Sequence, residues 1–192
     1  LANRQVLSRT AVDFFNDKIS DPLLLGNIEK AARTPTDVLL FNIDTKSDAD
    51  SKLNKDAIVK VFQRVFDDYQ GFCGAIPWLA EIERRLWREG VWDKFRTEFE
   101  AVNGETWESC RESIYFVFEK VVPVLASARS ISADSAQREL EQTEKDYSIS
   151  PDKFVKSIRD YLDRQDKRHR MAFLVDEVGQ YIGDNTNLML NL

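Results

Sequence analysis

Most of the chain carries apolar residues three or four positions apart, the spacing that gathers them on one face of an α-helix. This spacing predicts helices over Leu7–Ile19, Leu23–Ile28, Ile58–Tyr69, Trp78–Glu89, Trp92–Val102 and Trp107–Val122. The expected inner face of the second helix is Leu23, Leu24, Leu25 and Ile28. Two more helices are predicted to begin at Ser132 and at Ser150-Pro151, because serine caps first-turn amides and proline suits the first helical position. A last helix, capped by Asp184 or Asn185, is predicted to close the chain.

Two short, nearly continuous apolar runs interrupt the helical pattern, Asp37–Asp44 and Met171–Glu177. Runs of this kind are typical of strands buried on both faces of a parallel sheet. Parallel neighbours need a crossover of about a dozen residues, and the segment 45–170 is several times longer. The sequence therefore predicts an α/β fold with a large all-helical insertion between two strands. We expect a partial core at 1–50, the insertion at 51–166, and the return to the core at 167–192.

Composition supports a folded protein, with 43% hydrophobic and 31% charged residues. The net charge of −6 disfavours a domain whose main task is to hold nucleic acid, although it leaves room for a basic groove. No apolar run approaches the roughly 20 residues of a membrane span, and there is no signal-peptide pattern, so we expect a cytoplasmic protein without membrane contact. Cys73 and Cys110 lack a metal-ligand spacing and are expected to be buried free thiols.

The second apolar run ends in Asp176-Glu177. In P-loop ATPases a strand ending in two acids holds Mg²⁺ with the first and orients the attacking water with the second. Adjacent side chains on a strand diverge, so the two carboxylates can serve different partners. The alternative is a pair of solvated acids where a strand leaves the core. The phosphate-binding motif Gly-x-x-x-x-Gly-Lys-Ser/Thr is absent, since none of the seven glycines is followed by lysine, and we expect the chain to begin after it.

The residues around this acidic pair resemble the Walker B region of the large P-loop ATPase of bacteriophage-exclusion (BREX) defence systems, the BrxC/PglY family. The matching segments are Phe14–Ile19, Leu40–Asp48, Gln70–Leu79, Tyr147–Ser150 with Phe154, and Phe173–Asp184 running on to Leu188–Leu192. The resemblance implies an AAA-like nucleotide-binding domain that lacks its P-loop and its later sensor and arginine elements. It also implies that the intact protein binds ATP and Mg²⁺, acts with other phage-defence proteins, and self-assembles. The chain alone is then expected to be inactive.

Other residues are candidates for the same site. Asp44 and Lys46 follow the first strand, and are expected at the same sheet edge as Asp176, facing nucleotide or a neighbouring subunit. Gln180 follows the acids closely enough to sense a phosphate. Each of these residues has a plain structural alternative, as a loop or surface residue.

Three further groups of residues have a functional and a structural interpretation. The four tryptophans, Trp78, Trp87, Trp92 and Trp107, suit either stacking on single-stranded nucleic acid or packing in the helical insertion, and packing is favoured. Arg164, Lys167, Arg168 and Arg170 suit either DNA and acidic partners or a solvated helix end, the preferred interpretation. His169, the single histidine, is expected at a solvated surface position.

Two rival functions remain open from the sequence. One is a helical interaction module in which the acids have no catalytic part. The other is an insertion that grips DNA while the ATPase core drives movement.

Overall fold

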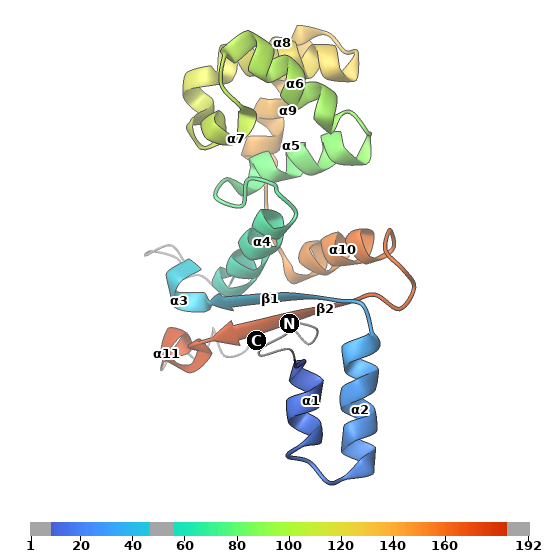
Figure 1. Ribbon diagram of the computed structural model, residues 1–192. Helices are drawn as coiled ribbons and strands as arrows, with labels where there is room; N and C mark the ends of the chain where they lie inside the picture. The colour runs from blue at the N-terminus through green and yellow to red at the C-terminus, as the bar shows by residue number, and fades with distance from the viewer. Residues whose placement is uncertain (1–8, 47–55, 184–192) are drawn as a thin grey trace.

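A computed structural model describes residues 9–46 and 56–183 (Figure 1). The elements in the first half are α1 (Ala11–Asn16), α2 (Pro22–Arg33), β1 (Thr36–Asn42), α3 (Ile43–Lys46), α4 (Ala57–Tyr69) and α5 (Pro77–Arg88). Those in the second half are α6 (Trp92–Asn103), α7 (Trp107–Cys110), the 3₁₀ turn η2 (Arg111–Ser113), α8 (Ile114–Arg129), α9 (Ala133–Asp146), α10 (Pro151–Leu162), β2 (Arg170–Asp176) and α11 (Val178–Ile182). The predicted closing helix lies outside the described residues.

The two strands pair in parallel, as the apolar runs predicted. The register runs from Thr36 opposite Arg170 to Asn42 opposite Asp176, so both strands end at the same edge. The first strand ends at Asn42 rather than at Asp44, because the chain turns into α3 at Ile43. The protein is thus mostly helical with a small parallel sheet, which agrees with the α/β expectation at that level.

One face of the sheet is covered by α4 and α10 (Figure 1). Phe62 of α4 packs edge-on against Phe41 of β1, with ring centroids 5.3 Å apart, and also lies 5.3 Å from Phe173 of β2. Phe154 of α10 completes this cluster at 5.9 Å from Phe173. The aromatic side chains of two helices therefore hold both strands from the same side.

The other face is not covered in the part of the chain that the structure describes. Leu40 of β1 is 68% exposed and Leu174 of β2 is 48% exposed, although their neighbours Leu39 and Phe41 are buried. The prediction of strands buried on both faces is therefore wrong for these residues. Side chains alternate along a strand, so a sheet covered by helices on one side alone leaves every second apolar residue exposed.

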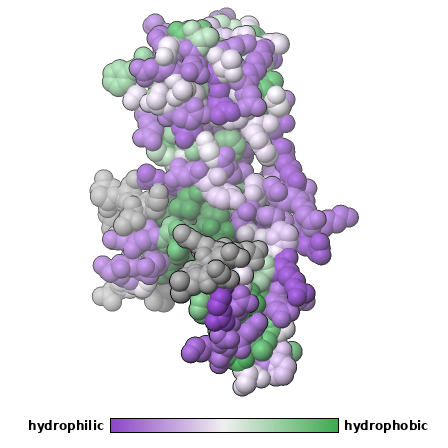
Figure 2. All heavy atoms as spheres, in the orientation of Figure 1, coloured by the Kyte–Doolittle hydropathy of each residue, from purple (hydrophilic) through white to green (hydrophobic). Residues whose placement is uncertain are grey.

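The α1–α2 hairpin extends away from the covered face (Figure 1). Asp21 begins α2 by accepting hydrogen bonds from the amides of Leu23, at 2.8 Å, and Leu24, at 3.2 Å. These two leucines are 76% and 46% exposed, so the prediction that they form the inner face is wrong. Figure 2 shows hydrophobic atoms gathered where α4 meets the sheet and only scattered among hydrophilic atoms on the hairpin.

The helices of the predicted insertion fall into two groups. Helices α5 to α9 enclose a core of their own, whereas α4 and α10 pack on the sheet. Trp107 is 1% exposed in the first core, and its indole Nε1 donates to the buried carboxylate of Glu83 at 2.6 Å. Trp78 is buried there as well. Core packing is confirmed for these two tryptophans, while Trp87 is 37% exposed beneath the guanidinium of Arg164.

The predicted serine caps and the predicted buried free cysteines are confirmed. Ser132 accepts from the amide of Ser135 at 3.2 Å, and Ser150 accepts from the amide of Lys153 at 3.3 Å with Pro151 in the first turn. Cys73 and Cys110 are free and buried.

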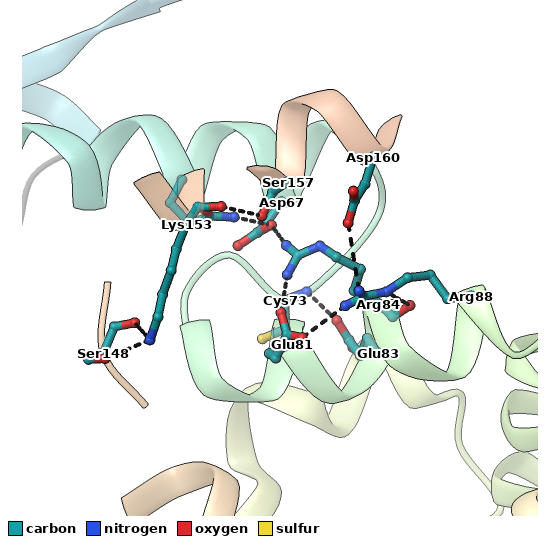
Figure 3. Close-up of polar contacts among 11 residues, drawn as sticks. Asp67, Cys73, Glu81, Glu83, Arg84, Arg88, Ser148, Lys153, Ser157 and Asp160 are labelled. Carbon is teal, nitrogen blue, oxygen red and sulfur yellow. Dashed lines mark hydrogen bonds and ion pairs between the residues drawn. The ribbon is translucent and has the colours of Figure 1, made fainter. Parts of the chain in front are cut away.

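Buried ionic contacts join the helical group to the sheet-covering helices (Figure 3). Arg84 of α5 reaches between Asp67 of α4 and Glu81, and both Arg84 and Asp67 are almost completely buried. Gln63 donates to the same Asp67 oxygen at 2.8 Å. Nearby, Arg88 of α5 and Asp160 of α10 form a looser, exposed pair at 3.8 Å. Burial raises the pKa of Asp67 to about 7, although Arg84 and Gln63 favour its charged form.

Replacing Asp67 with alanine should lower the free energy of unfolding by about 3–5 kcal/mol, because the buried guanidinium of Arg84 loses its partner on α4. Urea denaturation of the purified chain measures this. Asp160→Ala is the matched control, since it removes the exposed pair between the same two groups of helices and should cost less than about 1 kcal/mol. Equal losses in the two variants would contradict the assignment of the buried pair as the main ionic link.

The raised pKa of Asp67 also predicts a pH dependence. Between its ordinary value of 3.8 and about 7 the folded state binds a proton that the unfolded state has released, so the stability contributed by this group falls as pH rises through that window. Asp67→Asn should flatten the plot of unfolding free energy against pH between about pH 4 and pH 7. Asp160→Asn should leave the slope unchanged, and identical slopes in wild type and Asp67→Asn would refute the shift.

Candidate functional site

The candidate site lies at the carboxyl edge of the sheet, where β1 and β2 end together. Asp176 is the last residue of β2 and stands opposite Asn42, the last residue of β1. Helices α3 and α11 follow the two strands directly and contact each other. The sequence therefore placed Asp44 and Asp176 at one edge correctly, because parallel strands present their carboxyl ends together.

Asp176 projects from the strand end into solvent. Its Oδ1 accepts a hydrogen bond from the amide of Glu177 at 2.8 Å, which fixes the carboxylate beside the turn. Carboxylate oxygen is the donor that Mg²⁺ prefers. The residues that the structure describes contain no cluster of three or more His, Cys, Asp or Glu arranged for a metal ion. A Mg²⁺ ion here would therefore rest on Asp176 together with water and phosphate oxygens, which is how Mg²⁺ is usually held in nucleotide sites.

Glu177 occupies a strained position. It has φ 61° and ψ 24°, the left-handed conformation, and directly precedes α11. That conformation costs a residue with a Cβ about 1–2 kcal/mol, and glutamate has no short side chain to offset it. Glu177 forms the bend between β2 and α11, and it is exposed like Asp176. Strained backbone conformations of this kind cluster at active sites, ligand clamps and switch regions.

The short helix α11 is anchored so that the turn is held in place. Tyr181 and Ile182 are buried against Phe41, Ile43 and Ile58 beneath the sheet edge. The amide of Tyr181 donates to the carbonyl of Glu177 at 3.0 Å. The strained residue is therefore tied by its backbone to a helix with a buried inner side.

The remaining candidate residues surround the acids to different extents. Gln180 lies on the exposed side of α11, one turn from Glu177. Asp44 is half-buried in α3, and its amide donates to Asn42 Oδ1 at 2.9 Å. Lys46 ends α3, and its side chain lies outside the described part of the structure. Asn42 is the one edge residue that sequence reasoning missed, although a polar residue at the end of an apolar strand is the signal that would have found it.

His169 does not lie on the solvated surface as predicted. It is at the opposite, amino end of the sheet, where its Nε2 donates to Asp37 Oδ2 at 2.7 Å, and its side chain is only 15% exposed. Tyr161 donates to the same oxygen at 2.7 Å. Burial acts to raise the pKa of Asp37, but hydrogen bonds from Tyr161, Tyr69 and His169 outweigh it and hold the pKa below its ordinary value. These contacts fix the start of both strands and lie far from the acidic edge.

Compared with known proteins, the chain matches no protein-family model and no solved structure. Across residues 9–46 and 56–183, no helix has both the length and the apolar character needed to cross a bilayer.

Replacing Glu177 with glycine should raise the free energy of unfolding by about 1 kcal/mol, because glycine adopts the left-handed conformation without the Cβ penalty. Glu177→Ala keeps a Cβ at the same φ and should bring no such gain. Chemical denaturation of the three proteins compares them. If alanine stabilises as much as glycine, backbone strain at this turn is not the cause.

Proposed function

We propose that this chain is the Walker B part of a P-loop ATPase, an AAA-like nucleotide-binding core interrupted by a helical insertion. The observation that carries the proposal is the exposed pair Asp176 and Glu177 at the carboxyl end of a strand paired in parallel with β1. In α/β proteins, ligands bind beyond the carboxyl ends of parallel strands. The strained left-handed backbone of Glu177, the second acid, gives further support.

In the proposed site Asp176 would hold Mg²⁺ through its carboxylate, and Glu177 would orient and polarise the water that attacks the terminal phosphate of ATP. The bound Mg²⁺ would neutralise phosphate charge. Gln180 would contact phosphate from α11, and Asp44 and Lys46 would face the nucleotide or a neighbouring subunit from α3. The phosphate-binding loop is not part of this sequence, so the site acts only where another segment supplies that loop.

The biological setting that we propose is bacterial defence against phage, because the motifs resemble the BrxC/PglY family of BREX systems. The proposed partners are other proteins of the defence system and further copies of the intact ATPase, in the cytoplasm. The matching segments include the end of β1 (Leu40–Asn42), the turn between α4 and α5, the residues around the start of α10, and the second half of β2 (Phe173–Asp176) with α11.

The test is made in the protein as its gene encodes it, including whatever precedes Leu1. Glu177→Gln should retain Mg-ATP binding and slow hydrolysis by about 10² or more, because the amide cannot act as a general base. Asp176→Asn should instead weaken the dependence of ATP binding on Mg²⁺. Steady-state hydrolysis and nucleotide binding, measured with both variants, separate these two roles.

Hydrolysis unchanged by Glu177→Gln would refute the catalytic assignment. The rival is then a helical interaction module, which the separate core of α5 to α9 favours among the alternatives. The coding sequence upstream of Leu1 distinguishes the two as well, since the ATPase requires Gly-x-x-x-x-Gly-Lys-Ser/Thr there.

A further inference from the structure

Cationic side chains gather at the end of the sheet opposite the acidic pair. The last turns of α2 and the loop before β2 form the two walls of a groove of about 570 Å³, which we call the basic groove. Its cationic residues are Lys30, Arg33, Lys167, Arg168 and Arg170. A backbone hydrogen bond of 2.9 Å from the amide of Arg170 to the carbonyl of Pro35 joins the walls at their base. In Figure 1 this is where the upper end of α2 meets the starts of β1 and β2.

The charge of the groove is compensated only in part. All five cationic side chains are exposed, and among the residues that the structure describes Glu29 is the one acid in the lining. The lining residues thus carry a formal charge of +4 on a chain whose net charge is −6. Arg33 pairs with Glu29 at 3.2 Å and Arg168 with Asp166 at 3.7 Å, both in exposed positions. Lys30, Lys167 and Arg170 have no acidic partner among the residues that the structure describes.

Neither local structure nor helix electrostatics accounts for this clustering. The carbonyl end of α2 favours Lys30 and Arg33 in its last turn. It does not explain Lys167 and Arg168 on the loop that forms the other wall, or Arg170 at the start of β2, where like charges repel. Cations within about 8 Å of one another, the Debye length at physiological salt, repel each other, and a bound polyanion relieves this repulsion. Acidic residues farther away on the chain are screened by salt and do not relieve it.

The lining also indicates which polyanion fits. Apart from Pro35, the described lining consists of charged residues, glycine, Thr34 and the inward-turned His169, so these residues form no apolar pocket to anchor a peptide side chain. Within the described ranges 9–46 and 56–183, the groove is lined by no aromatic ring other than that imidazole, so unpaired bases find no stacking platform on these residues. A surface that offers only charge suits phosphates of a nucleic-acid backbone, and duplex DNA presents a dense array of them, about one negative charge per 1.7 Å of its axis.

We infer that the basic groove binds the phosphate backbone of duplex DNA without reading its sequence. The groove lies at the amino ends of the strands, roughly 20 Å from Asp176 along β2 at about 3.3 Å per residue. DNA bound there leaves the acidic edge open. The sequence pattern favours a solvated helix end at Lys167, Arg168 and Arg170, but the fold brings Lys30 and Arg33 beside them from far away in the sequence.

The experiment measures binding of the complete 192-residue chain to a labelled duplex of arbitrary sequence between about 50 and 200 mM salt. The plot of log affinity against log salt should fall with a slope of about −0.9 for each phosphate contact. For the double variant Lys167→Gln with Arg168→Gln, this slope should be shallower by about 0.9 for each lost contact. Lys30→Gln, on the other wall, should also weaken binding. Glu177→Gln should leave DNA binding unchanged, which keeps this outcome separate from the ATPase proposal.

The matched control is Arg138→Gln with Lys145→Gln, which removes the same charge from exposed positions on α9. Circular dichroism and thermal denaturation establish that all variants are folded. Absence of DNA binding at low salt, or an equal loss in the control, would overturn the inference. Preferential binding of poly-glutamate over DNA would assign the groove to an acidic protein instead and would overturn it too.

Discussion

The pairing of β1 with β2 is the contact on which the rest of the structure depends. It brings together two segments separated by residues 43–169, so its formation requires closure of a long loop. The loop-closure entropy is offset by the hydrogen bonds between the strands and by the packing of two aromatic rings. Phe62 of α4 packs on Phe41 of β1, and Phe154 of α10 packs on Phe173 of β2 and on Phe62. Both proposed sites are consequences of this one register. The acidic edge and the basic groove are the two ends of the same pair of strands.

Much of the local structure could be predicted because its causes are local. Ser132 and Ser150 cap their helices through amides three residues away, and the two strands followed from apolar runs. Contacts between distant segments could not be predicted in this way. His169 bonds to Asp37, and Arg84 to Asp67, through pairings that no periodic pattern encodes. The exposure of Leu40 was missed for a related reason, because an apolar run does not show how many faces of a strand are covered.

The candidate site could be predicted in part. Parallel pairing alone places Asp176 beside the end of β1, so the position of the two acids at this edge could be predicted from the sequence. The left-handed backbone of Glu177 was not, since glycine or asparagine is the usual signal for that conformation. The basic groove combines residues from α2 and from the loop before β2, and only the fold brings them together. Sequence reasoning thus identified residues along one segment more readily than groupings across segments.

The division of the hydrophobic residues between two cores has a consequence for how the protein unfolds. Helices α5 to α9 surround a closed interior, whereas the described part of the sheet is two strands wide with one face wet. A sheet of two strands has little stability of its own. Amide protons of β1 and β2 are then expected to exchange by local opening at a lower free energy than those deep in the helical group, so the sheet is the less stable unit of the chain. The edge that carries the acids belongs to the less stable unit, which is the part of a protein from which moving, ligand-responsive segments are usually drawn.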